Sequence, residues 1–168
     1  MTCVVGIDPG IKGGIAFLKD GKIVDTIAMP ITRTERGARV DVARLRAFLA
    51  KANPSLLLIE EPQVRPGENI KNHLTIGINF GIIYGIVMDM GIKHEIIPAS
   101  TWTHTIHSLI KGSKEWEIGA SKEKSLKVFN KLYPNSTTTH DGIVDAVLIA
   151  FYYLWRDGWI TKYKKPQP

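Results

Sequence analysis

The stretch 139-THDGIVDAVLIAFYYLW-155 is apolar apart from two aspartates near its start, Asp141 and Asp145. An apolar run of this length predicts a buried helix, in which about 100° of rotation per residue brings positions i and i+4 to the same side. Two like charges placed in this way cost about 0.2–0.5 kcal/mol. Asp145 is the more informative of the two, because its neighbours are apolar and a buried unpaired aspartate is rare. The pair therefore indicates a cation nearby.

Two further acids follow predicted strands. Asp8 ends the first strand in GIDPG, and Glu60 ends the apolar run LLLIE. If these strands are neighbours and the last helix packs over their carboxyl ends, the carboxylates of Asp8, Glu60, Asp141 and Asp145 meet. Close carboxylates repel one another or take up protons unless hard cations neutralise them, and Mg²⁺ prefers oxygen ligands. We therefore predict a site for two Mg²⁺ ions, with Mn²⁺ as a substitute, that hydrolyses a phosphodiester.

Each acid also has a structural interpretation. Asp8 before Pro-Gly could form a turn, and Glu60 could be a solvated charge at a strand end. Asp141 could be the N-cap of the last helix, which is a common role for an Asp before an apolar helix. Strand-end acids together with a helical pair are more specific for catalysis than any one of the four.

Composition predicts a single globular domain. The chain has 168 residues, of which 44% are hydrophobic and 23% charged. We expect one domain over residues 1–160 and a basic tail over residues 161–168. Cys3 is the only cysteine, which favours a reducing compartment and a cytoplasmic protein. The start of the chain lacks the features of a signal peptide, and we expect the most apolar run, residues 74–92, to be a buried helix and no part of a membrane.

The order of predicted elements indicates an α/β fold. A mixed five-stranded sheet flanked by helices on both faces accounts for the pattern. Strands are predicted over residues 2–8, 14–18, 22–29, 55–59 and 93–97, and helices over residues 41–53, 69–90, 100–110 and 121–132 and over the final apolar stretch. Residues 31–40, ITRTERGARV, are predicted to form a polar, basic loop.

The predicted helix over residues 69–90 carries glycine at every fourth position. Gly77, Gly81 and Gly85 share one face. Each glycine in a helix interior reduces helix stability by about 1 kcal/mol relative to alanine, so the presence of three glycines needs a reason. Close approach of another helix is that reason, either within the chain or across a homodimer. Both alternatives are open at this point.

The charge balance favours a polyanionic partner. The chain has 22 Lys and Arg against 16 Asp and Glu, a formal net charge of +6. Trp116 lies in a polar loop that suits base stacking. The candidates for phosphate contacts are Arg33, Arg36, Arg39, Arg65, Lys71, Lys111, Lys114, Lys122, Lys124 and Lys127.

Six segments, taken in order along the chain, resemble the RuvC family of Holliday junction resolvases, within the ribonuclease H-like superfamily. These segments are GIDPG, the strand-end IE, RPGENIKNH, GINFGIIYGIVMDMGI, IIPASTW and HDGIVDAVLIA. The likeness spans nearly the whole chain and is greatest to phage and bacterial members. It implies a ribonuclease H-like fold, a homodimer, and two-metal cleavage of four-way DNA in a bacterial or phage-infected cell.

The resemblance also implies roles for individual residues. By position, the metal ligands are Asp8, Glu60, Asp141 and Asp145. The segment SKEKS, residues 121–125, resembles a family segment whose lysine lies near the scissile phosphate, and this lysine falls on Lys124. The glycine-striped helix corresponds to the dimer-interface helix of the family.

The chain departs from the family pattern at two places. Many members space the last two aspartates three apart, but residue 142 is glycine, so Asp141 stands in. His140 could contribute instead, although we favour a helix-start hydrogen bond for it. The aromatic residue that often follows the strand-end glutamate is absent here, where Glu61 and Pro62 follow Glu60.

Three functions are compatible with these features. The first is a junction-resolving endonuclease, the second a ribonuclease H-like nuclease for other branched DNA or RNA/DNA substrates, and the third a noncatalytic junction-binding protein. An actin-like ATPase also begins with a strand bearing Asp, but it needs two ribonuclease H-like halves, and 168 residues supply one.

Overall fold

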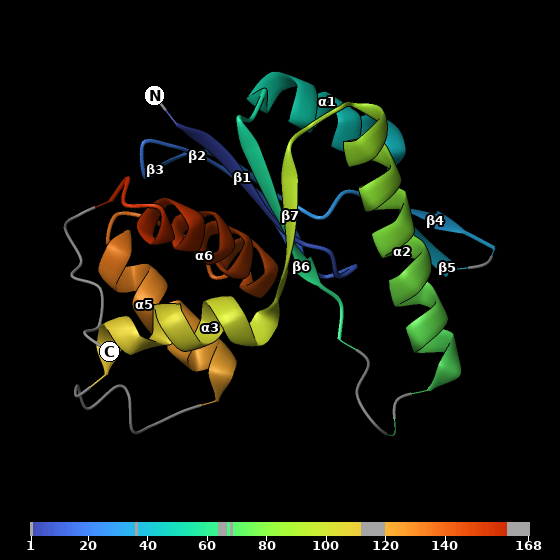
Figure 1. The fold of residues 1–168 in the computed structure, drawn as a ribbon. Coiled ribbons are helices and arrows are strands. Elements are labelled where there is room, and N and C mark those ends of the chain that lie inside the picture. Colours follow the sequence, from blue (N-terminus) through green and yellow to red (C-terminus); the bar gives the residue numbers. More distant parts are fainter. Residues whose placement is uncertain (1, 36, 64–66, 68, 112–119, 161–168) are drawn as a thin grey trace.

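The protein is described by a computed structural model that covers residues 2–35, 37–63, 67, 69–111 and 120–160. Its centre is a five-stranded sheet with the strand order β3-β2-β1-β6-β7 (Figure 1). Strand β2 is antiparallel to β1 and β3, whereas β6 and β7 run parallel to β1. The expected mixed sheet is confirmed. The strands are β1 (Cys3–Asp8), β2 (Gly14–Lys19), β3 (Lys22–Ala28), β6 (Leu56–Glu61) and β7 (His94–Pro98).

Helices cover both faces of the sheet, as expected (Figure 1). Successive strand residues point to opposite faces, so Val4 joins one core and Val5 joins the other. Helices α1 (Val42–Ala52) and α2 (Ile70–Asp89) cover one face; α3 (Ala99–His107), the short 3₁₀ turn η1 (Ser108–Ile110), α5 (Ser121–Leu132) and α6 (Asp141–Arg156) lie on the other. None of the helices within the described residues is long and apolar enough to cross a membrane.

Helix α6 lies directly on the backbones of β1 and β2. A Cβ atom on Gly6 would lie 2.1 Å from the carbonyl oxygen of Ala146, and one on Gly14 would lie 2.6 Å from the backbone of Gly142. Any side chain at these strand positions would push the helix away from the sheet. Glycine is therefore needed in the strands for the helix to lie where it does.

The amino-terminal end of α6 explains one departure from the family pattern. A Cβ atom on Gly142 would lie 2.3 Å from the backbone carbonyl carbon of Gly13. No aspartate fits at this position, and the acid nearest to it is Asp141. His140 caps the helix, with its Nδ1 accepting from the Ile143 N–H at 3.3 Å. This confirms the favoured interpretation of His140.

The prediction of a loop over residues 31–40 is wrong, because this segment forms a hairpin of β4 (Ile31–Thr34) and β5 (Gly37–Val40). All of β4 is exposed, so the sequence shows none of the apolar alternation that marks a half-buried strand. The hairpin is held by Asn79 of α2, which is 1% exposed. The Asn79 Oδ1 accepts from the Val40 N–H at 3.1 Å, and its Nδ2 donates to the Ala38 carbonyl at 3.3 Å.

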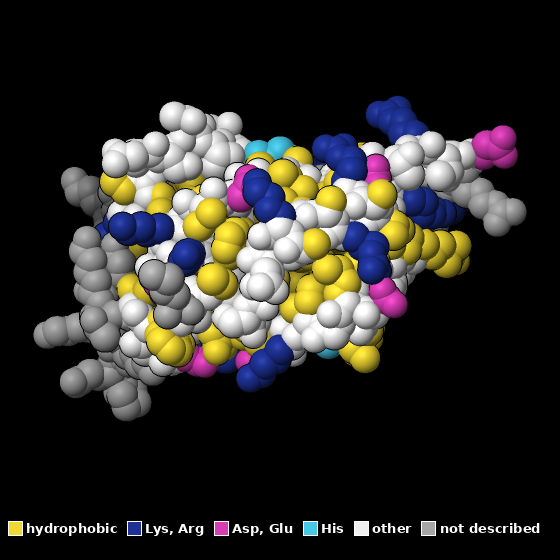
Figure 2. Space-filling model, turned by 90° about the horizontal axis from the view of Figure 1, so that it is seen from above, with side chains coloured by type: hydrophobic (Ala, Val, Ile, Leu, Met, Phe, Trp, Pro, Cys, Tyr) yellow, Lys and Arg dark blue, Asp and Glu magenta, His cyan; other side chains and the backbone are white. Residues whose placement is uncertain are grey.

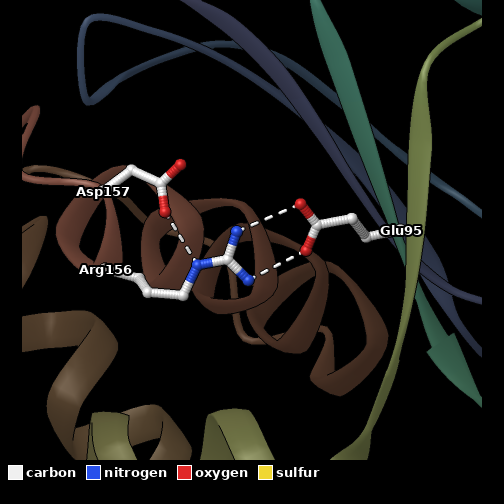
Figure 3. Close-up of polar contacts among 3 residues, drawn as sticks. All are labelled: Glu95, Arg156 and Asp157. Carbon is white, nitrogen blue, oxygen red and sulfur yellow. Dashed lines mark hydrogen bonds and ion pairs between the residues drawn. The ribbon is translucent and has the colours of Figure 1, made fainter.

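The carboxyl-terminal end of α6 is tied to the sheet by charged groups. Arg156 donates to both carboxylate oxygens of Glu95 on β7, at 2.8 and 3.1 Å, and its Nε donates to Asp157 at 2.8 Å (Figure 3). Such two-point arginine–carboxylate pairs fix geometry as well as adding energy. Helix α6 is therefore positioned by glycine contacts at one end and by this cluster at the other.

The glycine face of α2 packs against nothing in the described chain. A Cβ atom on Gly77, Gly81 or Gly85 would meet no atom within 4 Å. The exposed residues Leu74 and Met88 lie on the same helix, with 62% and 55% of their surfaces accessible. Close packing within the described chain therefore does not account for the stripe.

Candidate active site

Asp8 and Glu60 leave the sheet side by side. The parallel strands β1 and β6 pair as far as Ile7 and Ile59, and the next residue on each strand is an acid. The Asp8 Oδ1 accepts from the Gly10 N–H at 3.1 Å, so Asp8 also forms the turn that the Pro-Gly sequence indicates. This bond uses one carboxylate oxygen and orients the side chain.

Helix α6 brings the other two acids to the same strand ends. Its contact with Gly13 places its first turn against the loop that follows Asp8. Asp145 is partly buried on the sheet side, whereas the Asp141 side chain is 59% exposed. Asp145 is thus the better placed of the two for chemistry in a protected site.

The acids influence one another electrostatically. Burial raises the pKa of Asp145 to about 7, and the charges of Asp8 and Asp141 add to the rise. Burial raises the pKa of Glu60 to about 7, where the charges of Asp8 and Asp145 again contribute. Burial also raises the pKa of Asp8. Carboxylates with perturbed pKa values in one place are typical of functional sites.

The carboxylates do not form a ready-made metal site. Within the described residues, no three His, Cys, Asp or Glu side chains are grouped so that they could hold a metal ion. Besides the Gly10 amide on Asp8, side chains from other helices already donate to Glu60 and Asp141. Trp102 Nε1 donates to Glu60 Oε2 at 2.7 Å, and Lys122 Nζ donates to Asp141 Oδ2 at 3.0 Å.

Lys122 is the lysine that acts on the acids. Its positive charge offsets part of the rise in the pKa of Asp8 and of Asp145, and the hydrogen bond to Asp141 raises the pKa of Lys122 itself. Burial lowers the pKa of the His107 imidazole, and the charge of Lys124 adds to this effect. A place for Lys124 near the scissile phosphate stays a prediction from the family resemblance. The Lys122 side chain is 72% exposed, so its ion pair adds little to stability.

Sequence reasoning missed three polar residues that support the acids. Trp102 lies in the core with 2% exposure and donates to Glu60 from there. Ser125 of α5 hydrogen-bonds Asp145 and lies 3.1 Å from His107 Nε2. The only signal in the sequence was that buried Trp, Ser and His side chains need partners.

The predicted phosphate-binding residues are spread over several elements. Figure 2 looks onto the end of the molecule where α1 lies, and the Lys and Arg side chains seen there are dispersed. The candidate residues at the starts of α2 and α5 lie at the opposite end, at the bottom of Figure 1. Arg36, Arg65, Lys114, Trp116 and the tail of residues 161–168 lie outside the described residues. Within them, Arg33 is exposed on β4, Lys71 at the start of α2 and Lys111 after η1, while Lys122 and Lys124 lie in the first turn of α5.

Solved structures with the same architecture identify the fold. Thermus thermophilus RuvC in complex with a Holliday junction substrate matches with a TM-score of 0.64 and 14% identity, over 95% of this chain and 98% of that chain. The chain has the RuvC fold. A second structure of Thermus thermophilus RuvC matches with a TM-score of 0.61 and 16% identity, over 98% of this chain and 99% of that one.

The yeast mitochondrial Holliday junction resolvase Ydc2 also matches, with a TM-score of 0.58 and 14% identity, over 96% of this chain and 81% of that chain. The sequence matches no protein-family model and no curated protein. The predicted RuvC-like, ribonuclease H-like fold is therefore confirmed by structure, and the RuvC fold extends over nearly the whole chain.

The raised pKa of Asp145 predicts how stability depends on pH. The folded protein holds a proton on Asp145 up to about pH 7, whereas the unfolded chain loses it near 3.8. Stability from this group is therefore present at low pH and is lost as pH rises through about 7. In a chelating buffer, Asp145→Asn should melt about 2 °C or more above the wild type at pH 8, and by less at pH 5.

Melting curves at pH 5, 6, 7 and 8 measure this difference. Asp89→Asn is the control, because its side chain is 65% exposed at the end of α2. A wild-type to Asp145→Asn difference that stays constant over this range contradicts the assigned environment of Asp145.

Proposed function

We propose that the protein is a structure-selective DNA endonuclease that resolves four-way junctions by metal-dependent hydrolysis of phosphodiesters. The observation that supports the proposal is that Asp8 and Glu60 at neighbouring strand ends and Asp145 of α6 lie close enough for their charges to affect one another, on a fold shared with Holliday junction resolvases. Fold alone does not fix function, so the acids are essential to the argument. Their partial burial and raised pKa values are features of a reaction site and not of a solvated surface.

The acids fit divalent cations by their chemistry. Carboxylate oxygens are the ligands that Mg²⁺ prefers, and Mn²⁺ accepts the same ligands. The Lys122 ammonium already lies 3.0 Å from Asp141, and its charge offsets part of the rise in the pKa of Asp8 and Asp145, which supports a place for positive charge here. We propose that Asp8, Glu60, Asp141 and Asp145 hold two Mg²⁺ ions after small side-chain movements.

The protein's own groups would prepare the reaction. Bound divalent ions supply charge that activates water and stabilises the leaving 3′ oxygen. The Gly10 amide holds one oxygen of Asp8, and Trp102 holds one oxygen of Glu60. Lys122 would stabilise negative charge on the phosphate, because preorganised cations lower the free energy of such a transition state. Lys124, on the same helix turn, is a second candidate for this role.

DNA binding is proposed for basic residues around the site. A junction presents phosphates from several arms, so dispersed positive charge suits it better than one compact patch. The described candidates are Arg33, Lys71, Lys111, Lys122 and Lys124, and Arg36, Arg65 and Lys114 remain predictions.

A homodimer is proposed through α2. Resolving a junction requires cuts in two strands, which two copies of one site can make symmetrically. Gly77, Gly81 and Gly85 leave open space along α2, and small residues allow helix backbones to approach closely.

Cleavage of labelled four-way junctions tests the enzyme directly. With Mg²⁺, the wild type should cut paired strands, and Asp145→Asn should cut at least about 100-fold more slowly, because a carboxylate ligand is lost without a change in side-chain volume. The variant should still bind the junction in a gel-shift assay. Equal cleavage by the two proteins excludes Asp145 from catalysis.

Competition distinguishes junction resolution from the alternatives. Unlabelled four-way junctions should inhibit cleavage of the labelled junction more strongly than flaps, bubbles or RNA/DNA hybrids of equal length. Stronger competition by a hybrid or flap favours a nuclease for that substrate. Binding without cleavage by the wild type with Mg²⁺ or Mn²⁺ favours a noncatalytic junction-binding protein.

Gly81→Leu tests the dimer. A Cβ atom at position 81 would meet no atom within 4 Å in the described chain, so the monomer should fold normally, but the leucine side chain would separate two helices packed across the stripe. Sedimentation equilibrium should show a dimer for the wild type and a dissociation constant at least about 10-fold higher for the variant, a change of about 1.4 kcal/mol.

Asn72→Leu is the matched control. Asn72 is exposed on α2 and lies about 180° around the helix from Gly81, at about 100° per residue. The Asn72→Leu substitution should leave the dimer dissociation constant unchanged. A Gly81→Leu protein that dimerises as tightly as the wild type refutes an interface on the glycine face.

A further inference from the structure

Helix α3 begins beside Glu60. Strands β6 and β7 are parallel, with Glu60 paired to Ile97 and Glu61 paired to Pro98. The next residue, Ala99, is the first of α3. The first turn of this helix is therefore fixed next to the carboxylate by the register of the sheet.

Trp102 in that first turn reaches the carboxylate from the core. The residue is 2% exposed, and its indole Nε1 donates to Glu60 Oε2 at 2.7 Å. A donor at this distance favours the charged form of Glu60 against the repulsion from Asp8 and Asp145. It also restricts one carboxylate oxygen to a single direction.

A chain of hydrogen bonds connects the end of α3 to Asp145, and we call it the second path, after the direct bond from Trp102 to Glu60. His107 and Ser125 are 7% and 3% exposed, and the His107 Nε2 lies 3.1 Å from the Ser125 Oγ. The Ser125 hydroxyl hydrogen-bonds the Asp145 carboxylate. A hydroxyl has one proton, and an ionised carboxylate only accepts. When Asp145 is ionised, as a carboxylate that holds a metal ion must be, Ser125 donates to it and accepts from His107, whose proton then lies on Nε2.

We propose that α3 is a positioning element for the two partly buried carboxylates of the site. Trp102 orients Glu60 directly, and His107 orients Asp145 through Ser125. The inference rests on the proposed function, because it assigns these residues the task of preparing the carboxylates for a divalent cation. Outer partners of this kind fix ligand geometry, and their loss lowers metal affinity about 10- to 100-fold.

Trp102→Phe is the principal test, because it removes the N–H group and keeps an aromatic ring. Trp155→Phe is the matched control, since Trp155 is buried in the same core cluster with 6% exposure. Calorimetric titration with Mg²⁺ in the absence of DNA should show at least about 10-fold weaker binding for Trp102→Phe than for Trp155→Phe. Thermal melting in a chelating buffer measures how much each variant loses in stability without metal.

Ser125→Ala tests the second path. It should also weaken Mg²⁺ binding at least about 10-fold, and Ser125→Thr should restore it by returning the hydroxyl. In ¹⁵N NMR of the wild type, the Trp102 indole signal, assigned by its loss in Trp102→Phe, should shift on titration with Mg²⁺, and His107 should carry its proton on Nε2.

Equal Mg²⁺ affinity for Trp102→Phe, Ser125→Ala and Trp155→Phe overturns the inference, as does a wild type that binds no divalent ion. The junction assay separates this result from the proposed function. Weaker Mg²⁺ binding by the α3 variants, in a wild type that cuts no junction, supports positioning and refutes junction resolution. Junction cleavage with unchanged kcat and Mg²⁺ affinity in the variants supports the nuclease and refutes positioning.

Discussion

Helix α6 lies so close to β1 and β2 that no side chain fits at the glycines where their backbones meet. A Cβ atom on Gly6 or Gly14 would lie 2.6 Å or less from the backbone of α6, and one on Gly142 would lie 2.3 Å from the backbone of Gly13, just before β2. Protein interiors are packed too tightly to absorb such an overlap without moving an element. The position of every residue in the first turns of α6 follows from this contact, including Asp141 and Asp145.

The contact creates a site in which negative charge is unfavourable. Burial and mutual repulsion raise the pKa of Asp8, Glu60 and Asp145. The surrounding donors, Lys122 and Trp102 among them, offset only part of this cost. A site of this kind reduces the stability of the protein and gains from any cation that binds to it, which is the usual relation between stability and function in an active site.

The sequence predicted the sheet, the helices on both faces and the four acids, because these depend on local apolar patterns and on residues at strand ends. It did not predict the β4–β5 hairpin, whose strands lack an apolar alternation and which is held by Asn79 from a distant helix. The roles of Trp102 and Ser125 also depend on packing between elements, so their residue types alone did not reveal them. The absence of an acid at position 142 became understandable only from the contact with Gly13.

The free energy of unfolding of Gly142→Ala tests most directly whether this contact determines the site. Gly10→Ala is the reference, because a Cβ atom there would meet its nearest neighbour at 3.5 Å, an ordinary contact distance. Alanine is the better helix former by about 1 kcal/mol, yet we predict that denaturant unfolding shows Gly142→Ala to be less stable than Gly10→Ala by about 2 kcal/mol or more. Equal stability of the two variants, or a more stable Gly142→Ala protein, would contradict the account.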